Sequence, residues 1–333
     1  MQSAIATSHT VIANDPLGNL TELNKAFGDH LRLQILRLLR NESFSVLELC
    51  RILEIRQSAL SHHLKVLLNA QLVCTRREGN SIFYRRTFLT DEDPYCDMKE
   101  GIFCQIDMLQ LPKPSLKKIQ QIQLERAQQS LKFFNKNADK FREKQGLIVK
   151  HDDYANALHD VIDSLQLPTK SKVLEVGPGE GALLTELANK FAHLTALDNS
   201  EDMLEKSKEA IAKVENKRVR FILGDTSTAR KHQIKSDLII FDMVLHHISS
   251  PAKTFNDAAS LLNSNGYLLI IDLSNHDQDW ARQSCGDLWL GFDEGELNHW
   301  ANKSGLLTGP SSYLGLRNGF QIQIRVFIKR NDS

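Results

Sequence analysis

Three alternate glycines after a short apolar segment constrain the fold of this chain more than any other feature. The segment is Val173-Leu-Glu-Val-Gly-Pro-Gly-Glu-Gly181, and a helix-forming run, Ala182-Leu-Leu-Thr-Glu-Leu-Ala188, follows it. Strand, glycine turn and helix in this order bring the free N–H groups of a helix beside a backbone that a ligand can approach closely. The segment therefore predicts an α/β sheet with a ligand site at the end of this strand.

Apolar segments alternate with helix-like segments from residue 154 onward. Strands are expected at Lys172–Val176, Leu194–Leu197, Arg218–Leu223, Leu238–Phe241 and Tyr267–Asp272, with a final pair at Ser311–Leu316 and Gln321–Ile328. This alternation is typical of a mostly parallel sheet with helices on both faces. The final pair is expected to add antiparallel edge strands.

Acidic residues follow several of these strands, at the sheet edge where open α/β folds bind ligands. Asp198 comes 21 residues after Gly177, a spacing at which an acid accepts the ribose hydroxyls of a nucleotide. Asp225 follows the next strand and is placed to bind an adenine amino group. The same pattern also fits NAD, or a tight turn without a ligand in which Asp198 caps the next helix.

The first part of the chain has a different pattern. Thr21 to Arg86 is expected to form four helices and a hairpin that turns at Glu78-Gly-Asn80. Ser45 and Glu48 have the spacing of a capping box, and a break at 54–56 precedes a helix at 57–68. That helix has one apolar face, made of Leu60, Leu64, Leu67 and Leu68. The order of elements indicates a helix-turn-helix with a basic hairpin.

The second helix of such a motif enters the DNA major groove, with its first side chains at the base edges. The expected DNA contacts are the polar residues opposite the leucine face and those of the hairpin, namely Gln57, Ser58, Ser61, His62, Lys65, Arg76, Arg77 and Asn80. Gln pairs with adenine, and Ser reaches a base or a phosphate. The alternatives are a helical bundle with a solvated polar face, or a winged helix that binds a protein.

Composition favours two domains with different partners. The chain has 333 residues and no net charge, but residues 1–150 carry 22 Lys and Arg against 16 Asp and Glu, and the remainder carries 19 against 25. Only the first part is therefore expected to meet a polyanion. An odd set of five cysteines without a C-x-x-C pair favours reduced, cytoplasmic thiols and no metal site. No apolar run suits a membrane span, and the first residues do not resemble a signal peptide.

Four segments are expected. Residues 1–16 would be a flexible tail, 17–90 a winged helix, 91–148 a connector and long helix, and 149–333 the ligand-binding domain. The basic helix within 115–145 has neither Gly nor Pro and would serve as a dimer helix or a rigid arm.

The first domain resembles the ArsR-type winged helix-turn-helix family. The resemblance is carried by Phe27–Leu36, Gln57–Lys65 and Gly79–Arg85. It implies a homodimer that binds an inverted-repeat operator in double-stranded DNA, usually as a repressor. The metal-sensing branch of the family has a Cys-x-Cys pair in the helix before the recognition helix. Only Cys50 stands there, so metal sensing is not expected.

The second domain resembles the class I S-adenosylmethionine-dependent methyltransferases, near the ubiquinone-biosynthesis type. The resemblance is carried by Leu174–Gly181, Leu197–Leu204, Leu223–Asp225, Val244–Ile248 and Leu262–Leu269. It implies a Rossmann-like fold with a mostly parallel seven-stranded sheet and S-adenosylmethionine or S-adenosylhomocysteine as ligand. The implied binding residues are Glu175, Gly177, Gly179, Gly181, Asp198, Asn199, Met203, Asp225 and Thr226. Family members place Tyr or Trp before Asp as a lid. Here Phe141 precedes Arg142, and Tyr154 is the alternative.

Methyl transfer depends mainly on aligning donor and acceptor, because the sulfonium is already activated. His246 and His247 are the nearest candidates for a general base, and their alternative role is to begin the next helix or to bond the backbone. Chains that fuse these two domain types form a recognisable family, in which some members sense the adenosyl ligand. The resemblance thus implies a ligand-responsive regulator. The alternatives are an active methyltransferase on a small molecule and an NAD-sensing repressor.

Overall fold

The computed structural model describes residues 15–137, 146–214 and 218–331. The chain divides into two compact units, one extending to Arg76 and including Ile82–Lys118, the other comprising Arg77–Ser81 and the chain from Ile119. The division falls within a single helix, α6 (Lys113–Asn137), and not at the ends of the segment expected at 91–148. The expected tail before residue 15 and residues 138–145 of the expected long helix lie outside the described residues.

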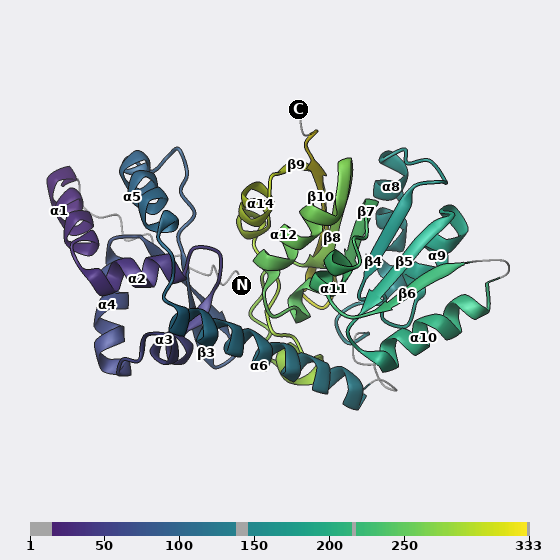
Figure 1. Ribbon diagram of the computed structural model, residues 1–333, viewed down its shortest axis with the longest axis horizontal. Helices are drawn as coiled ribbons and strands as arrows, with labels where there is room; N and C mark the ends of the chain where they lie inside the picture. The colour runs from purple at the N-terminus through teal and green to yellow at the C-terminus, as the bar shows by residue number, and fades with distance from the viewer. Residues whose placement is uncertain (1–14, 138–145, 215–217, 332–333) are drawn as a thin grey trace. The chain divides into compact units, whose positions relative to one another are not determined.

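The first unit is mostly helical. Its helices are α1 (Pro16–Phe27), α2 (His30–Leu38), α3 (Val46–Leu53), α4 (Gln57–Asn69) and α5 (Cys96–Met108). A three-stranded sheet in the order β1-β3-β2 completes it, with β1 at Phe44–Ser45, β2 at Val73–Glu78 and β3 at Ser81–Arg86. The expected helix-turn-helix followed by a hairpin is therefore present (Figure 1).

Local caps explain where the two helices of the motif begin and end. Ser45 caps α3: its hydroxyl accepts the N–H of Glu48, whose carboxylate accepts the N–H of Ser45 at 2.7 Å. Glu54 then adopts a left-handed conformation with φ of 58°, which ends α3 and allows the chain to turn into α4. The capping box and the break expected from the sequence are confirmed.

Helix α5 packs on this unit, although its residues were expected to belong to a connector. The rings of Phe27 and Phe103 meet edge to face at 6.4 Å, and Arg86 makes a bidentate ion pair with Asp107 at 2.9 and 3.1 Å. The acidic residues and Pro94 before the helix conceal it in the sequence, because they are typical of loops.

The second unit contains a seven-stranded sheet in the order β6-β5-β4-β7-β8-β10-β9 (Figure 1). Its strands are β4 (Lys172–Val176), β5 (His193–Asp198), β6 (Val219–Leu223), β7 (Ser236–Asp242), β8 (Leu262–Leu273), β9 (Leu306–Gly315) and β10 (Gln321–Lys329). The first five are parallel, whereas β10 is antiparallel to both neighbours. The expected mostly parallel Rossmann-like fold is confirmed.

The last three strands differ from expectation in length and place. Strand β8 begins at Leu262 because its pairing with β7 continues past a register shift, beside Asn265 with φ of 58°. Strand β9 begins at Leu306, ahead of the expected start at Ser311, and includes Pro310. Proline is tolerated there because β9 is the sheet edge. Strand β10 lies inside the sheet and not at its edge.

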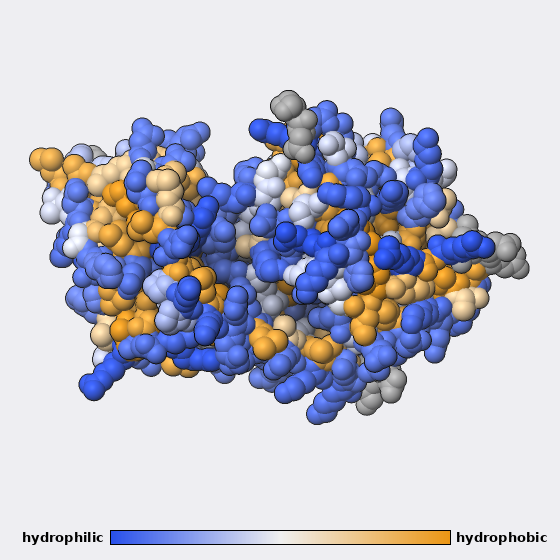
Figure 2. Space-filling view, in the orientation of Figure 1, coloured by the Kyte–Doolittle hydropathy of each residue, from blue (hydrophilic) through white to orange (hydrophobic). Residues whose placement is uncertain are grey.

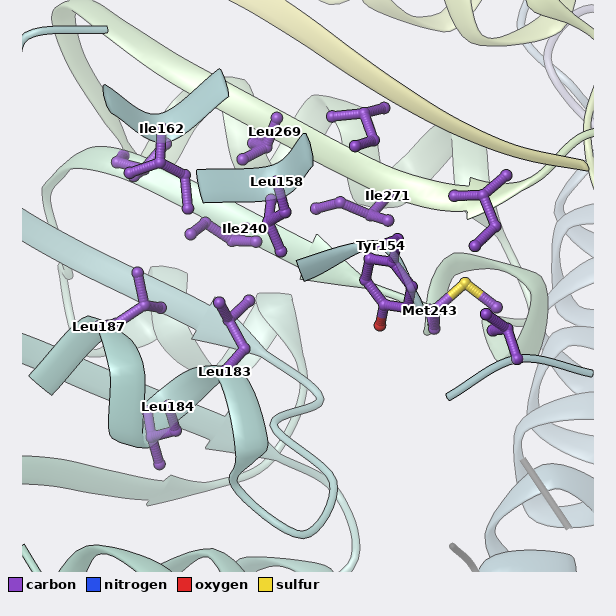
Figure 3. Packing of buried hydrophobic residues seen from close by; sticks show 14 of the residues in the cluster. Tyr154, Leu158, Ile162, Leu183, Leu184, Leu187, Ile240, Met243, Leu269 and Ile271 are labelled. Carbon is purple, nitrogen blue, oxygen red and sulfur yellow. The ribbon is translucent and has the colours of Figure 1, made fainter. Parts of the chain in front are cut away.

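Helices cover both faces of this sheet. They are α8 (Ala155–Ser164), α9 (Ala182–Lys190), α10 (Glu201–Ala212), α11 (Thr226–Lys231), α12 (Pro251–Leu261), α13 (Trp280–Ser284) and α14 (Glu294–Lys303), with short 3-10 turns η2 (His151–Asp153) and η3 (Leu245–His247). Figure 3 shows Leu158 and Ile162 of α8 and Leu183 and Leu187 of α9 packed beside the strand residue Ile240. On the other face, Phe255 of α12 contacts Trp300 of α14. Successive residues of the strands point to opposite faces of the sheet, and so they pack into two apolar layers.

Hydrophilic side chains dominate the visible face of each unit, with apolar patches among them (Figure 2). In the first unit the most exposed large apolar side chains are Leu17 of α1, Leu47 of α3, and Met108 and Leu109 at the end of α5. No helix among residues 15–137, 146–214 and 218–331 is long and apolar enough to cross a membrane.

Candidate functional site

A cavity of about 530 Å³ opens in the second unit at the carboxyl ends of its parallel strands. Glu175 comes from the end of β4, Asp198 from the end of β5 and Asp242 from the end of β7. Ala127, Ser130 and Phe134 of α6 also line it, a contribution that no motif in the sequence indicated. The cavity thus lies where the sheet topology predicts a ligand site.

The glycine turn forms one wall and requires its glycines. Gly177, Gly179 and Gly181 have φ of 69°, 57° and 82°, in the region that L side chains rarely adopt. A Cβ on Gly177 would lie 2.4 Å from Cγ2 of Val244, and one on Gly181 would lie 3.0 Å from Cβ of Ala210. Gly177 and Gly179 line the cavity. Gly181 is not a lining residue; it is the N-cap of α9 and packs against α10.

Glu175 is buried beneath this turn, and its Oε2 has no hydrogen-bond partner within the described part of the chain. Burial raises the pKa of Glu175 well above its usual range, and the nearby Asp242 carboxylate raises it further. A buried carboxyl of this kind is stabilised by a ligand that brings an N–H donor or a positive charge.

Asp198 ends β5 and accepts the N–H of Ser200 at 2.9 Å. Burial raises the pKa of Asp198 to about 6, although the backbone N–H groups of Ser200 and Asn199 oppose the shift. Ser200 itself caps α10 by accepting the N–H of Met203, so Asp198 is not needed as the cap of that helix. Asn199 and the buried Met203 line the cavity beside Asp198.

Asp225 is exposed and caps α11, since its Oδ1 accepts the N–H of Thr228 at 2.9 Å and the Thr228 hydroxyl at 3.1 Å. Thr226 is buried, and its hydroxyl donates to Asp257 at 2.9 Å. Both residues line the cavity, but each already has a structural bond. The cavity therefore brings together every predicted ligand-binding residue except Gly181.

Asp242 is the main lining residue that the sequence reasoning did not single out. Tyr154 donates its hydroxyl to Asp242 Oδ1 at 2.9 Å, and the Nδ1 of His151 lies 3.7 Å from Oδ2. Figure 3 shows the Tyr154 hydroxyl directed away from the apolar cluster. The signal was available, because Asp242 directly follows the apolar strand residues, as Asp198 does. Tyr154, the alternative lid residue, lines the cavity, whereas Phe141 lies outside the described residues.

His246 and His247 have different surroundings. His246 is buried, with Nδ1 2.7 Å from Asp272 Oδ1, and does not line the cavity. Burial opposes its protonation, but Asp272 and Asp287 raise the pKa of His246 to about 9. His247 lines the cavity and donates from Nδ1 to the Gly286 carbonyl at 3.2 Å. Burial and the neighbouring His246 hold the pKa of His247 well below its usual value.

The first unit presents a second candidate site on α4. Five of the predicted DNA contacts, Gln57, Ser58, Ser61, His62 and Lys65, are exposed. Leu60, Leu64 and Leu67 are buried on the opposite side of the helix. The Ser61 hydroxyl donates to the Gln57 carbonyl at 2.8 Å, so it already has one partner within the helix. One polar face of α4 is therefore free of core packing.

The predicted contacts of the hairpin are less uniform. Arg76 is buried, whereas Arg77 and Asn80 are exposed. Arg77 donates from Nε to the Gly79 carbonyl at 2.9 Å, and Arg77–Ser81 groups with the second unit. The predicted DNA contacts of the hairpin therefore differ from those of α4, which are all exposed and all belong to the first unit.

Comparison with known proteins assigns the two regions. Residues 29–75 match the family described as bacterial regulatory protein, arsR family, and residues 168–304 match a methyltransferase domain family. Magnesium protoporphyrin IX methyltransferase from Synechocystis, solved with S-adenosylmethionine, shares the fold of the second region. It covers 61% of this chain and 97% of its own, at 16% identity and a TM-score of 0.51.

Curated relatives match a part of this chain. An uncharacterized methyltransferase from Mycobacterium bovis is 26% identical over 118 residues, which are 35% of this chain and 58% of that protein. A hybrid PKS-NRPS synthetase from Thermothelomyces thermophilus is 32% identical over 133 residues, 37% of this chain but only 3% of that protein. The chain therefore spans a small fraction of the synthetases that it matches.

The two family matches agree with the two folds: a helix-turn-helix with a β-hairpin in the first unit, and a mostly parallel seven-stranded sheet in the second. The chain thus joins an ArsR-type helix-turn-helix to a class I methyltransferase-like domain.

Proposed function

We propose that this chain is a DNA-binding transcriptional repressor whose methyltransferase-like domain binds S-adenosylmethionine or S-adenosylhomocysteine as an effector. The observation that carries the proposal is the cavity in which the buried Glu175 and the half-buried Asp198 present carboxyls beside a glycine turn. The Synechocystis methyltransferase of the same fold was solved with each of these two ligands, which supports the ligand class. The odd set of five cysteines suits a cytoplasmic protein.

Each part of the ligand has a partner in the cavity. Asp198 would accept the ribose hydroxyls, and Met203 would pack on the adenine. Asp225 would accept the adenine amino group through Oδ2, because both of its bonds to Thr228 use Oδ1. Glu175 would lie beneath the amino-acid part, whose ammonium group suits a buried carboxyl.

The exposed face of α4 would bind the major groove of an operator. Gln57 and His62 offer side chains to base edges, and Lys65 offers a charge to a phosphate. Because Arg77 and Asn80 group with the second unit, the proposal for DNA contact rests on α4.

Helix α6 offers a route by which the ligand could affect DNA binding. Ala127, Ser130 and Phe134 of this helix line the cavity, and the same helix continues into the first unit at Lys118. A ligand that prefers one position of α6 would shift the population of DNA-binding states, with a coupling free energy of about 1–3 kcal/mol in typical systems.

The decisive experiment measures this coupling in both directions. Calorimetry would give the affinity of the full chain for S-adenosylmethionine, S-adenosylhomocysteine and NAD, with and without DNA from upstream of its own gene. We expect an adenosyl ligand to bind and its affinity to change about 5-fold or more with DNA, with the same factor seen for DNA affinity when ligand is added. A ligand affinity that is the same with and without DNA would contradict the proposed sensor role. Binding of NAD alone would contradict S-adenosylmethionine or S-adenosylhomocysteine as the effector.

A homodimer would suit an inverted-repeat operator. Exposed apolar side chains of the first unit support this proposal, among them the adjacent Met108 and Leu109 at the end of α5, since such side chains can mark interaction sites. Analytical ultracentrifugation should give twice the chain mass, and replacing Met108 and Leu109 by Lys should shift the population to monomers.

One observation favours a second function, methyl transfer to a small molecule. His247 lines the cavity, which places its imidazole beside a bound acceptor as a candidate general base. Turnover of S-adenosylmethionine in the presence of acceptors would support this function. Binding without turnover, combined with coupling to DNA, would favour the regulator.

A further inference from the structure

We propose that His246, His247 and Asp287 form a binding site for a divalent transition metal such as Zn²⁺. Each residue offers one ligand atom, and the three atoms lie within 4.8 Å of one another. The Nε2 of His246 lies 3.8 Å from Asp287 Oδ1, and the Nδ1 of His247 lies 3.9 Å from the same oxygen. The cysteine pattern of the sequence predicted no metal site, and 39 residues separate the histidines from Asp287.

The spacing suits a metal between the three groups. Zn²⁺ bonds to imidazole nitrogen and carboxylate oxygen at about 2.0–2.2 Å in a tetrahedral arrangement, which places neighbouring ligand atoms roughly 3.4 Å apart. The two separations from Asp287 Oδ1 exceed this by about half an ångström, a difference that small side-chain rotations can close. Binding through His247 Nδ1 would select the tautomer with its proton on Nε2 and would exchange the Gly286 carbonyl for the metal.

Asp287 independently points to a cation. Its side chain is fully buried, and neither carboxylate oxygen has a hydrogen-bond partner among the described residues. A buried carboxylate without donors is costly, so natural proteins pair such groups or use them to coordinate metals. The two histidine nitrogens are too distant to donate to it directly, and a metal between them would satisfy all three.

Asp272 provides the outer support that such a site needs. It is fully buried at the end of β8, and its Oδ1 lies 2.7 Å from Nδ1 of His246. This bond holds a proton on Nδ1 of His246, so the Nε2 that faces Asp287 is the nitrogen that would exchange its proton for a metal. A carboxylate behind a histidine ligand is the arrangement that fixes ring orientation in metal sites.

Two imidazoles and one carboxylate are ligands that suit Zn²⁺, Fe²⁺ and Co²⁺, and three protein ligands leave a coordination position open. His247 lines the cavity, which gives the metal a route of entry. The bound ion would link η3 to the segment around Asp287 and so fix one wall of the cavity. This inference holds whether the protein is a regulator or an enzyme.

Metal binding can be tested on the full chain after chelator treatment and dialysis. Titration with Zn²⁺ against a chromophoric chelator, together with elemental analysis, should show one tightly bound Zn²⁺ per chain. Co²⁺ should give the visible absorption bands of a four-coordinate site. Asp287→Asn and His247→Gln should each weaken binding by more than 100-fold, and Asp272→Asn by about 10–100-fold.

The matched control is His193→Gln, which removes an exposed histidine of the same unit. It should retain the tightly bound Zn²⁺, which separates the site from adventitious binding by surface histidines. Circular dichroism would verify folding, and two ligand variants guard against one of them failing to fold. Absence of a tightly bound Zn²⁺ in the parent chain, or its persistence in folded Asp287→Asn and His247→Gln, would overturn the proposal.

Discussion

The polar face of α4 and the cavity of the second unit hold their functional groups in different ways. On α4 the polar side chains are exposed, and one helix positions them through the buried leucines behind it. In the cavity, Glu175, Asp198 and Asp242 come from the ends of three strands and converge. A long charged partner can be met by an exposed surface, whereas a small ligand is selected by buried polar groups that it alone satisfies.

The largest effect should come from removing the support of α4. Leu64 is 1% exposed, so Leu64→Ala should lower the free energy of unfolding of the first unit by about 2–5 kcal/mol. Urea unfolding would measure it. Leu47→Ala, at a side chain that is 65% exposed, is the control and should change stability by less than about 0.5 kcal/mol. Equal effects of the two variants would contradict this account of α4.

Asp198→Ala tests the cavity. It should weaken adenosyl-ligand binding about 10- to 100-fold and abolish the ligand response, because hydrogen bonds to a charged group contribute roughly 1.5–3 kcal/mol. DNA affinity without ligand should not change. Asp163→Ala removes an exposed acid outside the cavity and should bind ligand normally. Unchanged affinity in Asp198→Ala would contradict the assigned site.

A double substitution, Gln57→Ala with His62→Ala, should weaken operator binding about 10-fold while ligand affinity stays the same. The expected loss reflects the roughly 1–3 kcal/mol that a good base contact contributes to discrimination. Fluorescence anisotropy with labelled operator would measure it. Normal operator binding by the double variant would exclude α4 as the recognition helix.

Lys65 and Lys25 form a matched pair of exposed lysines in the first unit, on α4 and α1. Lys65→Ala should reduce the slope of log affinity against log salt by about 1, because one phosphate contact is lost. Lys25→Ala should leave the slope unchanged. Equal slopes for the two variants would exclude a contact between Lys65 and a DNA phosphate.

The smallest effect concerns pH. Burial opposes protonation of His151, but Asp242 and Glu186 raise the pKa of His151 to about 9 from the usual 6.5. The stabilisation from its positive charge is therefore complete below pH 6.5 and is lost as pH rises toward 9. Urea midpoints across this range should fall, and His151→Gln should flatten that decline. If the urea midpoint of the variant falls as steeply with pH, other titrating groups cause the decline.

Much of the fold could be predicted because its signals are local. The glycine turn, the capping box of Ser45 and the apolar face of α4 are each read from fewer than about 15 consecutive residues. The strands that were extended beyond expectation, β8 and β9, contain Asn265 and Pro310, whose types are typical of turns. Sheet pairing overrode these local preferences.

Sequence alone determined that this chain has a helix-turn-helix, a glycine turn and acids after successive strands, because residue type and spacing encode these features directly. Tertiary structure decided which distant groups meet: Tyr154 with Asp242, His246 with Asp272, and both histidines with Asp287. Segments that are 26 to 88 residues apart make these contacts. Only the packing of β7, η3 and β8 brings such groups together, since no local periodicity records which buried polar side chain will face another.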